Sequence, residues 1–248
     1  MTLEMVSESL QTNQNAVHVW HVPLDGILSS DADMLLSQDE QERAERFRFN
    51  LDRQRFIFRR AALRHILGKY LETNPGDLRF CYNDSGKPRL ESPDGSPSLN
   101  FSVSQAGSIA LIAVTKTESV GVDIEALIEL PDVESLAKYT LSDQELVYFQ
   151  TVAANQKDWL FFSLWTCKEA LVKADGRGLS MPLSEIELAF SENAVARLTS
   201  IAGDRVAAAR WSLNQFVPSP GYLGVVAVES PAAIVEHIPY TALRDVGW

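Results

Sequence analysis

The stretch Gly121-Val122-Asp123-Ile124-Glu125 alternates small or apolar residues with acidic ones at the start of the second half of the chain. Successive residues of a strand point to opposite faces, so Val122 and Ile124 are predicted to enter a core while Asp123 and Glu125 share the other face. Two carboxylates on one face can hold a hard cation such as magnesium, which prefers oxygen ligands. The same pattern also occurs where a strand ends in solvent, and this stretch alone does not separate the two interpretations.

A second informative stretch, Trp165 to Lys173, lies within a predicted helix over residues 156–174. Trp165, Glu169 and Lys173 are spaced four residues apart, which places them on one face of that helix. A Glu four residues before a Lys is also a common surface pair, so the helix alone leaves both interpretations open. Residues 176–178, Gly-Arg-Gly, follow the helix and favour a close approach of another segment to the backbone.

Hydrophobic patterns in the rest of the chain predict further strands and helices. Strands are predicted over residues 16–22, 78–82, 98–104, 108–115, 119–125, 186–190, 210–216 and 222–228. Helices are predicted over residues 37–47, 52–71, 132–139, 142–151 and 156–174. Each half of the chain then runs from a strand through helices to further strands, which favours an α+β fold.

This pattern divides the chain into two halves, residues 1–117 and 118–248, which meet near residues 116–119. The sequence RRAAL at residues 59–63 is similar to CKEAL at residues 167–171, and both lie on long predicted helices. Such a short similarity is close to chance in alanine- and leucine-rich helices, so it gives only mild support for two similar halves.

Basic residues are concentrated in one segment of an otherwise acidic chain. The net charge is -11, which disfavours a general nucleic-acid binder. Residues 43–69 nevertheless hold nine of the 22 basic residues and only two acidic ones, a local charge of +7. Such a segment is either the solvated face of a helix or a docking site for a polyanionic ligand.

Several classes of protein are disfavoured by what the chain lacks. Its longest apolar runs, residues 108–114 and 221–228, have the length of strands and are too short to cross a bilayer. The N-terminus lacks the basic start and apolar core of a signal peptide, and Cys81 and Cys167 are the only cysteines, so we expect a cytoplasmic protein without disulfides. The four histidines are scattered, and no nucleophile elbow, Walker loop or dinucleotide motif is present.

Taken together, the two quoted stretches resemble the signature pair of one enzyme family. The motif G-[IV]-D-[IL]-E at residues 121–125, followed by W-x-x-K-E-[AS]-x-x-K-x-x-G at residues 165–176, is similar to that of 4'-phosphopantetheinyl transferases of the surfactin-synthetase-activating (Sfp) type. The resemblance extends to the arginine-rich helix from residue 52, the turn SGKP at residues 85–88, NFSVS at residues 100–104 and GRGL at residues 176–179. The first 15 residues and about the last 20 match nothing we can name.

The resemblance implies a fold of two similar α+β halves, related by a pseudo-twofold axis, with the active site between them. It implies a magnesium-dependent enzyme that transfers the 4'-phosphopantetheine arm of coenzyme A to a serine of an apo carrier protein. The carrier would be an acyl or peptidyl carrier of fatty-acid, polyketide or nonribosomal-peptide synthesis, and the other product would be adenosine 3',5'-bisphosphate. We expect a monomer, with no nucleic acid and no membrane among its partners.

The resemblance also carries over to particular residues. The magnesium ligands would be Asp123, Glu125 and Glu169, and the catalytic residues would be Glu169, Lys173 and Asp123. Glu169 would take the serine proton, directly or through water, and Glu145 is a weaker candidate for the same site. The residues expected to bind coenzyme A are Arg43, Arg55, Lys87, Pro88, Ser104, Gln105, Lys168 and Lys173.

Different parts of coenzyme A are assigned to these residues. Lys173 would lie against the phosphate next to the pantetheine arm. The adenine and phosphate pocket would be lined by Lys87, Pro88 and Ser104. Arg43 and Arg55 match basic positions near the 3'-phosphate, which would explain the local positive charge, since coenzyme A carries roughly four negative charges near neutrality.

The remaining assignments are less direct. Lys168 would either keep the carboxylate of Glu169 ionised or contact a phosphate. The carrier is expected to dock on a local basic or apolar patch around residues 142–151, because the whole chain is acidic and long-range attraction of an acidic carrier is not expected.

Gln105 is the one departure from the family pattern. The motif usually has a histidine after F-[NS]-x-S, where this chain has Gln105. A glutamine amide can donate a hydrogen bond but carries no charge. We therefore expect weaker coenzyme A binding or a flatter pH profile, with the chemistry retained.

Two other functions remain open at the level of sequence. A magnesium-dependent phosphatase or nucleotidyl hydrolase would use the same carboxylates, but it would not explain the turn at residues 85–88 or the tryptophan-led helix. A non-catalytic binding protein that kept the pocket is favoured only by Gln105, and the presence of Asp123, Glu125, Glu169 and Lys173 argues against it.

Overall fold

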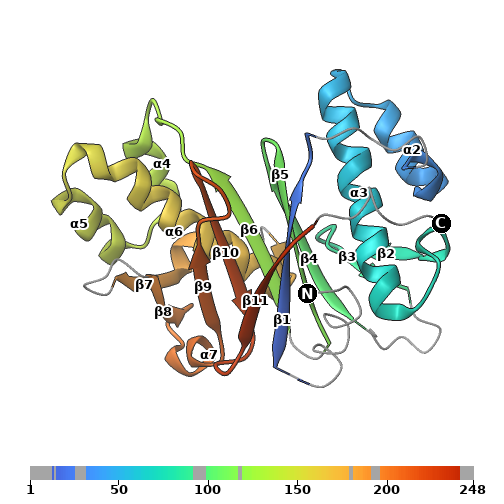
Figure 1. Ribbon diagram of the computed structural model, residues 1–248. Helices are drawn as coiled ribbons and strands as arrows, with labels where there is room; N and C mark the ends of the chain where they lie inside the picture. Colours follow the sequence, from blue (N-terminus) through green and yellow to red (C-terminus); the bar gives the residue numbers. More distant parts are fainter. Residues whose placement is uncertain are drawn as a thin grey trace.

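The computed structural model places two long helices on the outer sides of two central sheets (Figure 1). It describes residues 13, 15–25, 32–91, 99–116, 119–178, 181–190 and 196–240. Residues 117–118, which are part of the predicted junction, lie outside these ranges. So do most of the first 15 residues and residues 241–248. Among the described residues, no helix is both long and apolar enough to cross a membrane.

The first half begins with a strand and contains one of the two long helices. Its elements are β1 (Ala16–Pro23), α2 (Gln38–Glu45), α3 (Asn50–Leu71), β2 (Phe80–Tyr82), β3 (Pro88–Leu90), β4 (Asn100–Ala106) and β5 (Ile109–Thr115). Short 3-10 helices, η1 (Asp33–Leu35) and η2 (Pro75–Asp77), flank the helices. β5 pairs with both β1 and β4 in an antiparallel arrangement.

The second half repeats this plan. Its elements are β6 (Val120–Ala126), α4 (Val133–Thr140), α5 (Asp143–Thr151), α6 (Ala154–Asp175), η4 (Leu183–Glu185), β7 (Ile186–Phe190), β8 (Ala196–Ile201), α7 (Arg205–Ala209), β9 (Ser212–Phe216) and β10 (Tyr222–Val228). The strand order β6-β10-β9 matches the order β1-β5-β4 of the first half, and α3 and α6 both have 22 residues. The predicted α+β fold of two similar halves is confirmed.

Alternating apolar residues explain the layers. In β10, Val226 and Val228 face the first half's sheet, whereas Val225 and Ala227 face α6. Val122 and Ile124 of β6 join the same buried cluster between the sheets, as their alternation predicts. The outer face of the first sheet packs on α3 in a separate cluster. The order of layers is therefore helix, sheet, sheet, helix.

The last strand crosses between the halves. β11 (Ile234–Pro239) pairs in parallel with β1, so the first sheet has the order β11-β1-β5-β4. This arrangement differs from the predicted division of the chain at residue 118, because a segment of the second half completes the first half's sheet. Only Ile238 is buried in β11. An edge strand with so few buried positions leaves little hydrophobic pattern in the sequence. The sequence patterns also missed β8, together with β3 and α7, which have only three and five residues.

Each long helix is anchored by a glutamate from the preceding helix. Glu40 receives a hydrogen bond from the Ser37 backbone N–H and ion pairs from Arg60 and Arg64 of α3. Burial would raise the pKa of Glu40, but the two arginines hold it below its ordinary value. These contacts give Arg60 and Arg64 a structural role, so part of the basic segment serves the fold.

The second half repeats this anchor in detail. Glu145 receives a hydrogen bond from the Ser142 backbone N–H and an ion pair from Lys168 of α6, at 2.8 and 2.6 Å. In both halves the Glu is the third residue of a capping box, and the sequences LSQDE at residues 36–40 and LSDQE at residues 141–145 correspond. This repeat is a clearer sign of two related halves than the similarity between residues 59–63 and 167–171.

Candidate functional site

A glycine brings α6 against β6. A Cβ atom at Gly121 would lie 2.0 Å from the Ala170 carbonyl oxygen and 2.3 Å from the Ala174 nitrogen. No side chain fits there, so only glycine allows the helix to pack directly on the strand. This contact brings the next two alternate residues of β6, Asp123 and Glu125, beside the polar face of α6.

Asp123 joins the two halves of the molecule. Its Oδ1 accepts hydrogen bonds from Ser104 Oγ of β4 at 2.8 Å and from Lys173 Nζ of α6 at 2.6 Å. Lys173 also donates to Ser104 Oγ at 2.9 Å. Asp123 is 3% exposed, and its second oxygen, Oδ2, is buried without a hydrogen-bond partner in the described part of the chain. A buried carboxylate oxygen that lacks a donor is a ready acceptor for a cation or a proton.

Glu125 and Glu169 lie near Asp123. Glu125 Oε1 accepts a hydrogen bond from Trp165 Nε1 at 2.8 Å, which gives the first residue of the α6 motif a positioning role. Burial raises the pKa of both glutamates, and the charge of Asp123 raises it further. The three carboxylates therefore repel one another enough to favour a positive ligand or a shared proton.

Two of the three carboxylates are engaged by neighbouring side chains. Among the described residues, no three His, Cys, Asp or Glu side chains are grouped so that they could hold a metal. The contacts above give the reason, since Lys173 holds Asp123 and Trp165 holds Glu125. The all-oxygen donor set and the unsatisfied Asp123 Oδ2 nevertheless fit a hard cation such as magnesium.

The turn over residues 83–88 closes onto the end of α6. Asn83 Nδ2 donates to the Gly176 carbonyl at 2.8 Å, and Ser85 Oγ donates to the Arg177 carbonyl at 2.8 Å. A Cβ atom at Gly178 would lie 2.8 Å from Ser85 Cβ, so the predicted close approach at the glycine-rich exit is present. The roles of Asn83 and Ser85 were not predicted, because a turn sequence does not say which distant segment it contacts.

Lys87 fastens the same turn to the second half. Its Nζ donates to the carbonyls of Val120 at 3.2 Å and Ala174 at 3.1 Å. Burial lowers the pKa of Lys87 to about 8. Its stem, together with Pro88, lines two adjoining cavities of about 290 and 450 Å³. The smaller cavity also contains Glu169 and Lys173, so it opens directly onto the carboxylate site.

Comparison with known proteins gives a consistent result. The model of a family described as "4'-phosphopantetheinyl transferase superfamily" matches residues 119–225. The model of a second family, described as "4'-phosphopantetheinyl transferase, N-terminal", matches residues 28–117. The chain is 40% identical to 4'-phosphopantetheinyl transferase HetI of Nostoc sp. over 86% of its own length and 87% of that protein. It is 27% identical to 4'-phosphopantetheinyl transferase Sfp of Bacillus subtilis, over 64% and 68% of the two chains.

The chain belongs to the 4'-phosphopantetheinyl transferase superfamily. A putative 4'-phosphopantetheinyl transferase of Synechocystis sp. is 34% identical over 68% of each chain. A solved structure described as the Chronobacterium ammoniagenes ACPS-CoA complex aligns with a TM-score of 0.35 and 17% identity, over 46% of this chain and 96% of that one. The family models and the identity to HetI confirm the resemblance noted from the sequence motifs.

Two residues predicted in the substrate site of this transferase family member, Lys168 and Glu145, pair with each other instead. Lys168 is completely buried, and its Nζ donates to Glu145, to the Thr140 carbonyl and to the Leu183 carbonyl. Adjacent residues of a helix point about 100° apart, so Lys168 points away from the direction of Glu169. Its partner Glu145 belongs to α5, so Lys168 faces α5. Lys168 and Glu145 form an internal ion pair, so we correct the predictions that placed them in the substrate site.

Three other residues predicted to bind coenzyme A, namely Arg55, Arg43 and Gln105, differ in their contacts. Arg55 donates two hydrogen bonds to Asp25, at 2.8 and 3.0 Å, and this pairing already uses its guanidinium. Arg43 is exposed and stands 5.6 Å from the ring centre of Phe56. Gln105 is half-buried at the end of β4 and donates a long hydrogen bond of 3.4 Å to the Gly107 carbonyl.

Proposed function

We propose that this chain transfers the 4'-phosphopantetheine arm of coenzyme A to a serine of an apo acyl or peptidyl carrier protein. The observation that carries the proposal is the junction at Asp123, where Ser104 of the first half and Lys173 of the second meet one carboxylate. The adjoining cavities provide room for a nucleotide ligand beside this junction. The first half would supply the adenine and 3'-phosphate side, and the second half the metal and catalytic side.

Asp123, Glu125 and Glu169 would hold magnesium. When bound, magnesium would orient the pyrophosphate of coenzyme A and neutralise its charge. Asp123 Oδ2 has no hydrogen-bond donor among the described residues, which supports this assignment. The raised pKa of Glu125 and Glu169 also supports it, because it shows that their negative charges are not balanced by nearby positive groups. Trp165 would keep Glu125 directed towards the site through its indole N–H.

Glu169 would act as the general base. The carrier serine Oγ forms a bond to the pantetheine-side phosphorus, and the bond from that phosphorus to the bridging oxygen breaks, which releases adenosine 3',5'-bisphosphate. Glu169 takes the serine proton, and its raised pKa suits that role because the proton is better held at neutral pH. Lys173 would place its ammonium against the departing phosphate, where positive charge favours phosphoryl-type transfer.

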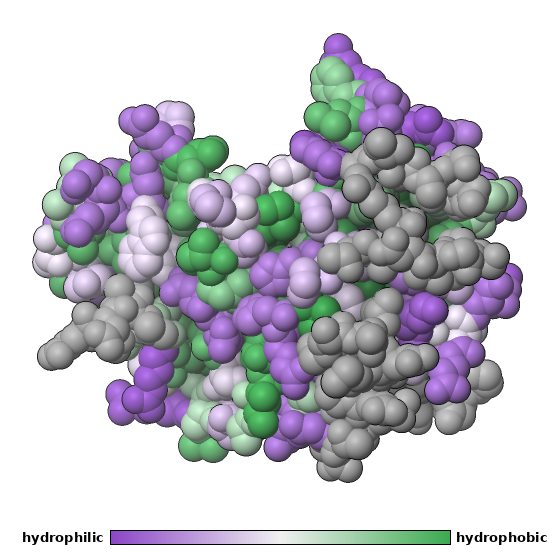
Figure 2. All heavy atoms as spheres, viewed as in Figure 1, coloured by the Kyte–Doolittle hydropathy of each residue, from purple (hydrophilic) through white to green (hydrophobic). Residues whose placement is uncertain are grey.

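The carrier would dock near the exposed apolar side chains of α4 and α5. Tyr139 of α4 and Val147 of α5 are 87% and 68% exposed, and Leu136 and Tyr148 are also exposed. Exposed aromatic and aliphatic side chains are typical anchors of protein contacts. Figure 2 shows that the surface is hollowed between these helices and the tip of α3, which leaves space for a partner.

We also propose that the enzyme acts as a cytoplasmic monomer. One chain supplies both Ser104 and Asp123, so the site does not require a second copy. Cys81 and Cys167 are both free, in keeping with a reducing compartment.

A mass measurement of the carrier tests the proposal. The protein is incubated with magnesium, coenzyme A and an apo carrier, and the carrier should gain about 340 Da, the mass of the phosphopantetheine arm. Phosphate release without carrier labelling would instead indicate a hydrolase, and no change would indicate a binding protein. Glu169→Gln should lower the labelling rate by at least about 100-fold at saturating magnesium. If that variant retained the wild-type rate, Glu169 would not be the base.

A further inference from the structure

Two histidines from opposite ends of the chain meet where β11 joins β1. His21 Nε2 and His237 Nδ1 are 3.0 Å apart, and the planes of the two rings stand at 74° to each other. Alternation explains the meeting, because His21 follows Val19 and His237 follows Val235 on the strand faces that look towards the second sheet. The parallel pairing of β1 with β11 then brings the two imidazoles together across the strands.

The neighbours of the two rings hold them in place. The ring centre of Phe216, in β9, is 4.3 Å from that of His237 and 5.5 Å from that of His21. His21 also donates a hydrogen bond to the Pro218 backbone carbonyl. Because a neutral imidazole has a single N–H, the Nε2 atom that faces His237 then presents a lone pair. Metal-binding histidines show this arrangement, in which the second ring nitrogen donates to a carbonyl or carboxylate.

The separation of the two nitrogens suits a shared ion. Two nitrogens bound at about 2.1 Å to one metal ion stand about 2.9 to 3.4 Å apart in square-planar, octahedral and tetrahedral geometry, and the observed separation is 3.0 Å. Burial lowers the pKa of both histidines, and the neighbouring His237 lowers that of His21 further. Both rings are therefore neutral near pH 7, the form in which imidazole binds metals.

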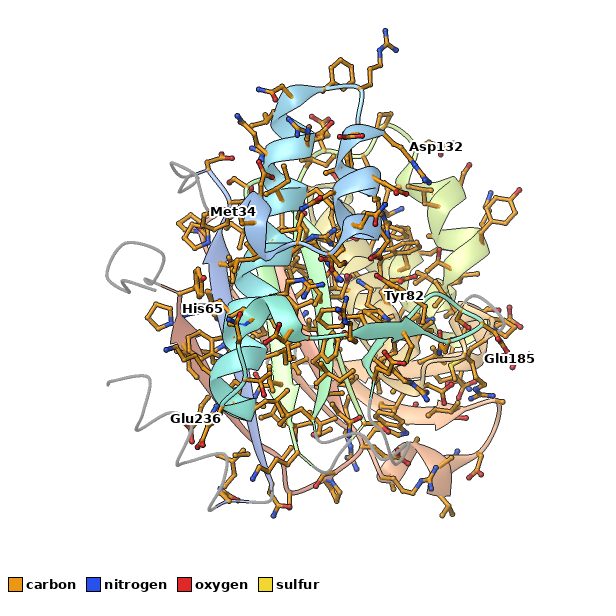
Figure 3. The ribbon with its side chains drawn as sticks, turned by 90° about the vertical axis from the view of Figure 1, so that its right-hand side faces the viewer. Met34, His65, Tyr82, Asp132, Glu185 and Glu236 are labelled. Carbon is orange, nitrogen blue, oxygen red and sulfur yellow. The ribbon has the colours of Figure 1, made fainter. Side chains whose placement is uncertain are left out.

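This histidine pair is separate from the carboxylate site in both place and chemistry. The carboxylate site lies where β6 meets β4, whereas β9 and β11 stand at the other ends of the sheet orders β6-β10-β9 and β11-β1-β5-β4. Figure 3 likewise shows Glu236, the neighbour of His237, on the opposite side of the molecule from Tyr82, whose hairpin borders the cavities. Oxygen ligands suit magnesium, whereas imidazole nitrogens suit zinc, copper and nickel.

We infer that His21 Nε2 and His237 Nδ1 bind one divalent transition-metal cation of the zinc, copper or nickel class. Water would complete its coordination, because no third His, Cys, Asp or Glu side chain is grouped with them in the part of the chain that the structure describes. The ion would replace the hydrogen bond between the rings, and the proton on His237 Nδ1 would move to its Nε2, so no net proton is released. Such an ion clips the last strand to β1, and the inference does not rest on the transfer function.

Calorimetric titration with zinc chloride tests the site, with magnesium in excess to occupy the carboxylates. The wild type should bind one zinc ion that magnesium does not displace. His21→Asn and His237→Asn should each lower the zinc affinity at least about tenfold, because each change removes one of the two ligands. With zinc at about 100 times its Kd, the thermal unfolding midpoint of the wild type should rise by about 5 °C, and that of either variant should not.

Control variants separate this pair from other ligands on the surface. Cys81→Ser removes an exposed thiol, which zinc also prefers, and Asn214→Ala changes an exposed side chain of β9. Both should bind zinc as the wild type does. His237 is exposed, so His237→Asn tests the site even if His21→Asn does not fold.

Electron paramagnetic resonance of the copper-loaded protein gives a second measurement. The wild type should show two coordinated imidazole nitrogens, and His237→Asn should show one. Absence of zinc binding by the wild type, unchanged affinity in either histidine variant that folds, or loss of binding in Cys81→Ser would overturn the site. Carrier labelling by the wild type is unaffected by any of these outcomes, so the proposed function is judged separately.

Discussion

The two long helices, α3 and α6, are held in the same way but present different chemistry. Each has 22 residues, and each places a buried basic side chain against the glutamate of a capping box in the preceding helix. α3 packs on its sheet mainly through apolar residues such as Ala62 and Ile66. α6 instead approaches β6 at Gly121 and places Lys173 beside Asp123. One structural frame thus supports an apolar contact in one half and a polar site in the other.

The largest effect is expected where α6 touches β6. Gly121→Ala would place a Cβ atom 2.0 Å from a backbone oxygen of the helix, which neither element can absorb by a side-chain shift. The free energy of unfolding should fall by about 3 kcal/mol or more, and carrier labelling should be lost. Denaturant unfolding and the labelling assay measure the two effects.

Gly76→Ala is the matched control for this prediction. Its Cβ would approach only a side-chain oxygen of Asn74, at 3.4 Å, so stability should change little. If Gly121→Ala were as stable and active as this control, the close approach of α6 to β6 would not be the basis of the site.

The next effect concerns the anchors that the helices share. Glu145→Gln leaves Lys168 buried without its counter-charge, and Glu40→Gln does the same to Arg60 and Arg64. Each should lower the free energy of unfolding by about 3 kcal/mol. The kcat of carrier labelling should stay within about twofold for Glu145→Gln, measured below the unfolding temperature, because this pair lies away from the carboxylate site. A large fall in kcat without loss of stability would return Lys168 and Glu145 to the substrate site.

A difference in acid stability is expected between the halves. His18 and His65 are buried in the first half, and burial lowers the pKa of each to about 4. The unfolded chain therefore binds more protons than the folded one between about pH 6.5 and pH 4, so stability falls as the pH falls through that range. The free energy of unfolding at pH 5 should be lower than at neutral pH by on the order of 2 kcal/mol for each histidine.

Hydrogen exchange at pH 7 and pH 5 can locate this loss. The backbone amides of β1 and α3 should lose protection before those of α6. His65→Gln should make the stability of the first half less dependent on pH, since one of the two titrating groups is removed. Equal loss of protection in α3 and α6, unchanged in the variant, would contradict the assignment.

The smallest effect is expected at Gln105. Gln105→His restores the residue that the family motif usually has, and a protonated imidazole could add a charge-assisted contact to phosphate. The KM for coenzyme A should fall about two- to fivefold at pH 6 and change less at pH 8, where the imidazole is neutral. Stability should be unaffected, because Gln105 makes only a long hydrogen bond to Gly107. A variant with the same KM as the wild type at both pH values would show that this position does not meet the phosphates.

Local sequence patterns were sufficient for much of the fold. The alternation of residues 121–125 predicted which side chains of β6 enter the core, and β7 and β10 have their predicted bounds, because strand and helix periods follow directly from backbone geometry. The four-residue spacing of Trp165, Glu169 and Lys173 likewise placed these residues on the face of α6 that meets β6.

Local patterns failed where a residue's partner is distant in the chain. Lys168 follows the same motif as Glu169, yet the packing of α5 on α6 places it in an internal pair with Glu145. Arg55 is one of several basic residues on α3, and only the tertiary structure shows that Asp25 holds its guanidinium. The weak pattern of β11 gave no sign that it would join the first sheet.

The sequence by itself determined the family, the α+β halves and the set of polar residues from which the site is built. The tertiary structure decided which of those residues meet one another. The physical reason is that charge and periodicity are local properties of a chain, whereas the pairing of a buried charge depends on which oxygen or nitrogen the packing brings within hydrogen-bonding distance.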